Sequence, residues 1–312
     1  MKVRRLTTNG YVGLADGSHS LSDENGRAAD VVVVTGPVAS GKSSFLEAIA
    51  LCAEDVARSG KPSERGNGRV RSDSVAAKLE LTWELSSEEA VRVGSEQLEL
   101  SSETILLWGP TTEPAFHNDS LVALFASYAH SSDVGKVELF GEEREIRGGG
   151  GRALLAESAQ RSLRLSRDGY KYACVRAFLA YLALPAAEMN VEKTRARFAR
   201  SLTALGVTRR LVGANSDGKV YFASEGGDAL ELEELSRGDR EAVLFASTAS
   251  LVALDSSTIL VDRPEQHMAC DEVAQFVAGL RDLGKDNQII IATGSRELVA
   301  MTAPGTIVRL GS

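Results

Sequence analysis

The sequence predicts an α/β protein whose parallel sheet is built from both ends of the chain and is interrupted by a mostly helical lobe. Three observations support this fold class. Short apolar runs of strand length occur near both ends, as is typical of strands buried on both faces of a parallel sheet. A glycine-rich turn joins the first run to a helical pattern. From Leu121 to Leu205 the periodicity is mostly helical.

The first part of the chain is expected to consist of strands, turns and one long helix. Val3–Leu6 and Tyr11–Leu14 flank Asn9-Gly10, a dipeptide typical of tight hairpins. Val31–Val34 is a β-branched run typical of a buried strand, and Ser43–Arg58 has apolar residues at helical spacing. Three more strands are expected at Val75–Leu85, Gln97–Leu100 and Thr104–Trp108.

The last part of the chain repeats the alternation of strand and helix. Strands are expected at Lys219–Ala223, Ala229–Leu232, Thr258–Val261, Gln288–Ala292 and Ile307–Leu310, with helices at Ser236–Leu254 and Asp271–Leu283. This order implies a core formed by residues 1–109 and 235–312 around an inserted helical lobe, residues 110–234.

Composition excludes several classes of protein. With 312 residues, 43% of them hydrophobic, the chain can bury a sizeable core. Its net charge of −8 argues against a protein that coats nucleic acid with its whole surface. Its 3 cysteines form no CxxC, which argues against a disulfide scaffold or a zinc ribbon. The absence of a long apolar run indicates a soluble protein, expected to be cytoplasmic, with no membrane partner.

Charge is distributed unevenly along the chain. Between Gly151 and Arg210 twelve basic residues face four acidic ones, so this basic lobe carries +8 and the rest of the chain −16. Arg161, Arg164, Arg167, Arg197 and Arg200 are candidates for a stripe that contacts phosphates. A solvated helix face gives the same pattern. DNA and an acidic protein therefore remain alternative partners.

The glycine-rich turn carries the strongest motif. It reads Gly36-Pro37-Val38-Ala39-Ser40-Gly41-Lys42-Ser43 and matches G-x-x-x-x-G-K-[ST], a phosphate-binding P-loop. Its backbone N–H groups are expected to surround phosphates, Lys42 to reach the β and γ oxygens, and Ser43 to bind Mg²⁺. Ser44 is a further candidate at the N-terminus of the following helix.

Two later segments complete the candidate site. The strand Thr258–Val261 is followed by Asp262, a candidate second ligand of Mg²⁺; a capping role for Asp262 is the alternative. Ser236 and Gly238 lie at the start of the long helix, where they suit a second anion site. Ser236 serving only as an N-cap is the simpler explanation.

In this order the motifs resemble those of ATP-binding-cassette (ABC) ATPases, and more narrowly the RecF, SMC and OLD-like AAA ATPases. The resemblance covers Gly36–Ser43, Leu235–Arg240, Thr258–Glu265 and Ile289–Ser295. It implies ATP and Mg²⁺ as cofactors and a dimer in which each ATP lies between the P-loop of one subunit and the Ser236 and Gly238 segment of the other.

The sequence departs from that family where hydrolysis takes place. Arg263 stands where the family has a glutamate that polarises the attacking water, and a guanidinium cannot accept a proton. Gly294 stands where the family has a histidine. Glu265 is a candidate substitute base and His267 a weaker substitute for the histidine. With Lys42 and Asp262, Glu265 completes the candidate catalytic set.

The expected function is an ATP-binding head that dimerises around ATP and acts as a slow or impaired ATPase switch in a larger complex. That complex is expected to handle DNA or to serve in a defence system. The alternative is a catalytically inactive scaffold that binds nucleotide. A small-molecule kinase or GTPase is disfavoured, because no Asn-Lys-x-Asp motif occurs and the Leu235–Arg240 segment would have no role.

Overall fold

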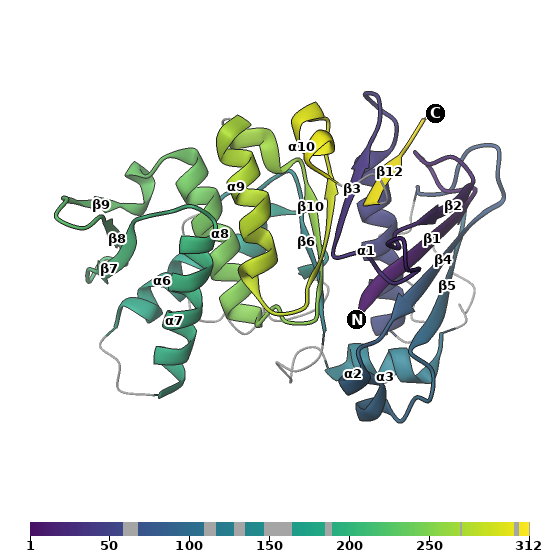
Figure 1. Cartoon of the computed structure of the whole chain (residues 1–312), viewed down its shortest axis with the longest axis horizontal. Helices are drawn as coiled ribbons and strands as arrows, with labels where there is room; N and C mark the ends of the chain where they lie inside the picture. Colours follow the sequence, from purple (N-terminus) through teal and green to yellow (C-terminus); the bar gives the residue numbers. More distant parts are fainter. Residues whose placement is uncertain are drawn as a thin grey trace. The chain divides into compact units, whose positions relative to one another are not determined.

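The computed structural model describes residues 1–58, 68–108, 117–127, 135–146, 164–184, 189–268, 270–302 and 306–311 (Figure 1). The chain divides into two compact units. The first comprises Met1–Phe140, Asp255–Arg263 and Asp286–Ser312, and the second Gly141–Leu254 and Pro264–Lys285. The sequence predicts breaks near residues 110 and 235, whereas the structural units change after Phe140, Leu254, Arg263 and Lys285.

An antiparallel sheet of order β2-β1-β4-β5 forms one layer of the first unit. Its strands are β1 (Lys2–Asn9), β2 (Gly17–Ser20), β4 (Ala76–Glu84) and β5 (Glu99–Leu107). Alternate residues of β4 and β5 are buried, as expected for a sheet with one face on the core. The two strands expected between Gln97 and Trp108 are one continuous strand, because β5 pairs with β4 along its whole length.

The hairpin partner of β1 differs from the expectation. Gly17–Ser20, and not Tyr11–Leu14, pairs with β1, with Thr8 opposite Gly17. The loop is wider than a two-residue turn because its polar groups are bonded internally. The Asp16 carboxylate accepts from the Gly10 N–H at 2.8 Å, and the Thr8 hydroxyl donates to the Ala15 carbonyl at 2.9 Å.

A parallel sheet of order β12-β3-β11-β10-β6 forms the other sheet of this unit. Its strands are β3 (Val31–Thr35), β6 (Val137–Phe140), β10 (Thr258–Asp262), β11 (Gln288–Ala292) and β12 (Ile307–Arg309). The helices are α1 (Lys42–Arg58), α2 (Ser87–Val93), α3 (Asp119–Ser127) and α10 (Arg296–Met301). β6 corrects the prediction of a mostly helical segment: its four residues are too few to show a period, and pairing with β10 fixes them as a strand.

Gln288 joins the two sheets. This side chain is fully buried at the start of β11. Its amide nitrogen donates to the carbonyls of Val3 at 2.8 Å and Ala29 at 3.0 Å, and its amide oxygen accepts from the Val3 N–H at 2.7 Å. One polar side chain thus satisfies three buried backbone groups at the point where β1 and the parallel sheet meet.

The second unit combines helices with a small sheet. Its helices are α6 (Val175–Ala183), α7 (Met189–Ala204), α8 (Arg237–Val252) and α9 (Cys270–Leu280), with 3-10 turns η2 (Gly169–Tyr172), η3 (Leu232–Glu234), η4 (Pro264–His267) and η5 (Arg281–Leu283). The strand β8 (Val220–Ala223) pairs with β7 (Arg210–Ala214) and with β9 (Ala229–Glu231), so the three form a sheet of their own. The sequence suggested instead that Lys219–Ala223 and Ala229–Leu232 return toward the core, and that expectation is wrong.

The described cysteines are structural. Cys52 and Cys174 are free and buried, and burial raises the pKa of the Cys52 thiol to about 12, which makes it unreactive. Among the helices that the structure describes, none is both long and apolar enough to cross a membrane.

Candidate functional site

The P-loop, Gly36–Ser43, connects β3 to α1 in the first unit. Two of its glycines are required by close contacts. A Cβ atom at Gly41 would lie 1.9 Å from the Gly13 carbonyl oxygen, and one at Gly36 would lie 2.5 Å from the Leu310 carbonyl oxygen. The neighbouring loop and the end of β12 therefore hold the P-loop backbone in place, and side chains at these two positions are excluded.

The polar side chains at the end of the P-loop contact its own backbone and β10. The Lys42 ammonium donates to the carbonyl oxygens of Gly36 at 3.0 Å and Pro37 at 2.6 Å. The Ser43 hydroxyl donates to Asp262 Oδ1 at 3.1 Å, although the two residues are far apart in sequence. Asp262, at the end of β10, is 2% exposed. The structure therefore brings together the two residues that the sequence assigned to Mg²⁺.

These residues suit a magnesium–phosphate group. A hydroxyl and a carboxylate oxygen at hydrogen-bond distance are ligands that Mg²⁺ prefers. Ser40 Oγ is buried and makes no hydrogen bond within the described part of the chain, so a phosphate oxygen would satisfy it. Lys42 and Ser43 begin α1, whose first N–H groups also favour an anion. Lys42 would hold the phosphate, and Ser43 and Asp262 the ion.

The other predicted P-loop residues have different surroundings. Val38, at the tip, is 96% exposed. Ser44 contacts the neighbouring loop, because a Cβ at Gly13 would lie 2.7 Å from Ser44 Oγ. Sequence reasoning did not assign Gly13 to the site. Only its proximity to a turn signal could have indicated that this loop supports the P-loop.

Ala39 has a backbone conformation that glycine adopts more easily, with φ at +62°. Ala39→Gly is therefore expected to raise the free energy of unfolding by about 0.5–1 kcal/mol, measured by urea unfolding followed by circular dichroism. Ala253→Gly is the matched control, because Ala253 is the C-cap of α8 and has φ at +53°. This substitution should raise the free energy of unfolding by a similar amount, and because Ala253 lies outside the P-loop it should leave nucleotide affinity unchanged. Loss of stability in Ala39→Gly alone would contradict this account.

The two positions that depart from the family pattern also lie in the first unit. Arg263 follows Asp262, is exposed, and has φ at +50°. Its N–H donates to the Ala292 carbonyl at the end of β11 at 2.8 Å. Gly294 follows β11 and is open: a Cβ there would meet no atom within 4 Å, and its φ is not in the left-handed region. The Arg263 guanidinium cannot accept a proton at neutral pH and Gly294 has no side chain, so neither residue can act as a general base.

The predicted signature residues are described within the second unit. Ser236 is the N-cap of α8, with its hydroxyl accepting from the Asp239 N–H at 3.0 Å, and Gly238 lies in the first turn. Capping accounts for Ser236 locally and leaves the first N–H groups of the helix available to an anion. Glu265 lies in η4, also in the second unit. The side chain of His267 is outside the described residues.

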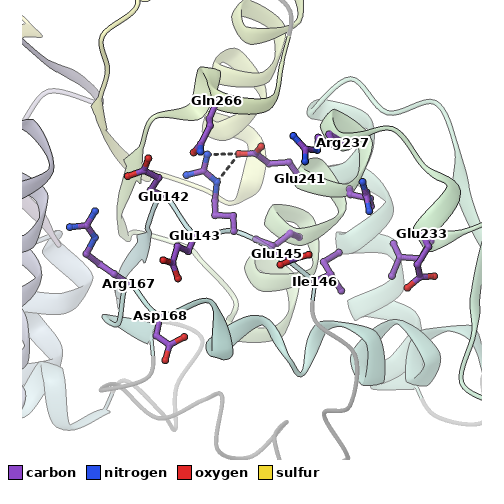
Figure 2. A pocket seen from close by; sticks show the side chains of 14 residues that line it. Glu142, Glu143, Glu145, Ile146, Arg167, Asp168, Glu233, Arg237, Glu241 and Gln266 are labelled. Carbon is purple, nitrogen blue, oxygen red and sulfur yellow. Dashed lines mark hydrogen bonds and ion pairs between the residues drawn. The ribbon is translucent and has the colours of Figure 1, made fainter. Parts of the chain in front are cut away.

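A pocket of about 1050 Å³ borders the start of α8 within the second unit (Figure 2). Arg237 and Arg240 line it together with acidic residues that follow β6, among them Glu142 and Glu143. At its wall Glu241 accepts from Arg144 at 2.7 Å. Burial raises the pKa of Glu241, while Arg144 opposes that shift. No pattern in the sequence indicated this pair, because its members are far apart along the chain.

The proposed basic stripe is not continuous. Arg164 is 1% exposed and lies beside Cys174, so it cannot face a ligand in solvent. Arg161 lies outside the described residues, and Arg167 borders the pocket. Arg200 is exposed on α7 and Arg197 half-exposed. The i, i+3 spacing could not separate a buried arginine from an exposed one.

The parallel sheet, the antiparallel sheet of the same unit and the P-loop between β3 and α1 define a P-loop α/β fold of the kind found in ABC-type ATPase heads. Comparison with solved structures agrees with this class. The chain is similar to an SMC head solved bound to the C-winged helix domain of ScpA, with 13% identity, 96% of this chain and 91% of that chain covered, and a TM-score of 0.58. The SMC head domain from Thermotoga maritima gives 15% identity, 96% and 92% coverage and a TM-score of 0.53.

A third similar structure is an Smc head with an extended coiled coil, bound to the C-terminal domain of ScpA derived from Pyrococcus furiosus. It is 12% identical, with 96% of this chain and 91% of that chain covered and a TM-score of 0.55. No protein-family model and no curated protein matches the sequence. At such low identity the solved structures establish the fold, and the function is argued from the site.

Proposed function

We propose that this protein is an ATP-binding, ABC-type ATPase head that binds Mg·ATP and acts as a slow or impaired switch within a larger complex. One observation carries the proposal: the hydroxyl of Ser43, the P-loop residue that follows Lys42, lies 3.1 Å from Asp262 Oδ1 at the end of β10. A glycine-rich turn that matched the motif by chance would not be expected to lie beside a buried carboxylate of β10.

The resemblance to head-type ATPases extends the proposal to an ATP-dependent dimer. In such a dimer the ATP held by Lys42 and Ser43 of one subunit would contact Ser236 and Gly238 of the other. The exposed N-cap residue and the glycine in the first turn of α8 support this role, since they allow a phosphate to approach the helix N-terminus. A homodimer and a pair with a related head are both compatible with these features.

A DNA-related role rests on analogy with the SMC heads and on the basic charge of residues 151–210. The burial of Arg164 weakens a direct phosphate stripe. An acidic protein partner at this lobe is the other proposal. A cytoplasmic location is expected of such a complex and remains part of the proposal.

The test is ATP binding by the purified chain and by Lys42→Ala. Removing a charged donor to phosphate is expected to weaken ATP binding roughly 10- to 100-fold, measured by calorimetry in Mg²⁺. Lys219→Ala is the control, because Lys219 is a partly exposed lysine paired with Glu231 in the second unit. Equal affinity in wild type and Lys42→Ala would overturn the proposed site.

Two further measurements on the same proteins distinguish a slow ATPase switch from an inactive scaffold. Light scattering with and without ATP reports dimerisation, and phosphate release reports turnover. ATP-dependent dimers with slow turnover that Lys42→Ala abolishes would support the switch, with Glu265 as the first candidate base. ATP binding without turnover above the Lys42→Ala background would favour the inactive scaffold. This alternative is supported by Arg263 and Gly294, which stand where the family pattern has a glutamate and a histidine.

A further inference from the structure

The pocket that borders the start of α8 differs from an ordinary surface hollow in its size and its lining. Its volume of about 1050 Å³ is at the upper end of the range for small-molecule sites. Every described residue that lines it belongs to the second unit, and most of them carry a charge. A cavity with such a lining is suited to a polar ligand and not to an apolar one.

Charges of opposite sign lie on different sides of this pocket. Figure 2 shows Glu142 and Glu143, which follow β6, on the left and Arg237, at the start of α8, on the right. Within the described part of the chain, the exposed side chains of Glu143 and Arg237 form no ion pair with each other or with another residue. A ligand with only one sign of charge would be attracted by one side of the pocket and repelled by the other.

The wall between these charges contains a buried ion pair (Figure 2). The side chains of Arg144 and Glu241 are 0% and 2% exposed. Nε and Nη2 of Arg144 both lie 2.7 Å from Glu241 Oε1, and Nη1 donates to the Gly141 carbonyl at 2.6 Å. The other carboxylate oxygen of Glu241, Oε2, is buried and accepts no hydrogen bond from the described residues. A hydrogen-bond donor on a ligand would satisfy this oxygen.

The start of α8 is the expected position of an acidic group on the ligand. Arg237 and Arg240 both line the pocket, and their spacing places them on the same face of the helix. The N-terminus of this 16-residue helix adds a partial positive charge. A guanidinium binds a carboxylate through paired hydrogen bonds. An ammonium group of the same ligand is then expected on the side of Glu143 and of Glu241 Oε2.

We propose that this pocket binds a small zwitterion, a molecule of the amino-acid class with an ammonium group toward Glu143 and a carboxylate toward Arg237 and Arg240. The site is formed by residues of the second unit, whereas the P-loop belongs to the first. The proposal therefore goes beyond the nucleotide site and does not depend on it.

The experiment compares three ligands whose carbon chains have the same length. ε-Aminocaproate has one ammonium and one carboxylate group, hexamethylenediamine has two ammonium groups, and adipate has two carboxylates. Their dissociation constants for the full chain are measured by ligand-observed NMR in the absence of nucleotide. ε-Aminocaproate is expected to bind at least about 10-fold more tightly than either of the others, because each of those places a charge beside side chains of the same sign.

Two variants test the two sides of the pocket separately. Arg237→Gln should weaken the binding of ε-aminocaproate and adipate roughly 10-fold and should not weaken that of hexamethylenediamine. Glu143→Gln should weaken the binding of ε-aminocaproate and hexamethylenediamine and not that of adipate. The controls Arg210→Gln and Glu225→Gln make the same charge changes at exposed positions of the second unit outside the described pocket lining, and should change no dissociation constant.

Circular dichroism establishes that each variant is folded before it is titrated. Equal affinities of the wild type for the three ligands, or no binding of ε-aminocaproate, would overturn the proposal. It would also be overturned if Arg237→Gln and Glu143→Gln weakened all three ligands equally or weakened none, because the two signs of charge would then have no separate positions. None of these results bears on ATP binding at the P-loop, since no nucleotide is present.

Discussion

The double variant Arg263→Glu, Gly294→His is expected to hydrolyse ATP about 10²- to 10⁴-fold faster than the wild type, the range that positioned general acid–base groups contribute. The wild-type chain has the proposed ligands of phosphate and Mg²⁺, namely Lys42, Ser43 and Asp262. It has Arg263 and Gly294 where the family pattern that its motifs resemble has a glutamate and a histidine. Restoring a carboxylate after Asp262 supplies a proton acceptor, and a histidine after Thr293 supplies a second polar group near the phosphate.

The structure accommodates both substitutions. Arg263 already has a Cβ atom at φ +50°, so glutamate inherits the same backbone cost and no new one. A Cβ at Gly294 meets no atom within 4 Å, so a side chain can begin there without a clash at its first atom. Steady-state phosphate release from Mg·ATP, measured at concentrations that saturate each variant, checks the result.

The matched control is Arg263→Gln, Gly294→His. Glutamine has the shape of glutamate and removes the same positive charge, yet it cannot accept a proton at neutral pH. A gain in the glutamate variant that the glutamine variant lacks would assign the effect to general-base chemistry. Equal rates in the two variants, with ATP still bound, would mean that the slow step lies elsewhere, for example in dimer formation.

The site was more predictable from sequence than the path of the chain around it. The P-loop is a local motif whose geometry follows from Gly36, Gly41 and the flanking strand and helix. Asp262 was assigned to the site because an apolar strand ends in a carboxylate downstream of the P-loop. Its approach to Ser43 is possible because the carboxyl ends of parallel strands share one edge of a sheet. Both inferences needed only short stretches of sequence and a general rule.

The errors arose where tertiary contacts decide. Val137–Phe140 is a strand because β10 lies beside it, and nothing in four residues can show that. The partner of β1 was set by the internal bonds of Asp16 and Thr8 and not by the Asn9-Gly10 signal. Arg164 has the periodicity of a surface residue and is buried. In each case the structure depends on a contact that is distant in sequence or that a pattern of apolar and polar residues does not reveal.

Gln288 also has partners that are distant in sequence, and its contribution to stability is expected to be large. Gln288→Met is expected to lower the free energy of unfolding of the first unit by about 3–5 kcal/mol. Methionine has a similar length and volume, so the change leaves little cavity. It removes both partners of Val3 and the partner of the Ala29 carbonyl, and these backbone groups are too buried to find water. Unsatisfied buried polar groups cost about 1–3 kcal/mol each.

Urea unfolding followed by the fluorescence of Trp83 is a suitable measurement, because Trp83 is fully buried on β4 in the same unit. Gln97→Met is the control: this residue is exposed beside β5, and its substitution should change stability by less than about 0.5 kcal/mol. Equal midpoints for the two variants would show that β1 and the parallel sheet do not depend on Gln288. Since β3 precedes the P-loop directly, a marked loss would also predict weaker ATP binding near the unfolding midpoint, without any change in a residue that contacts phosphate.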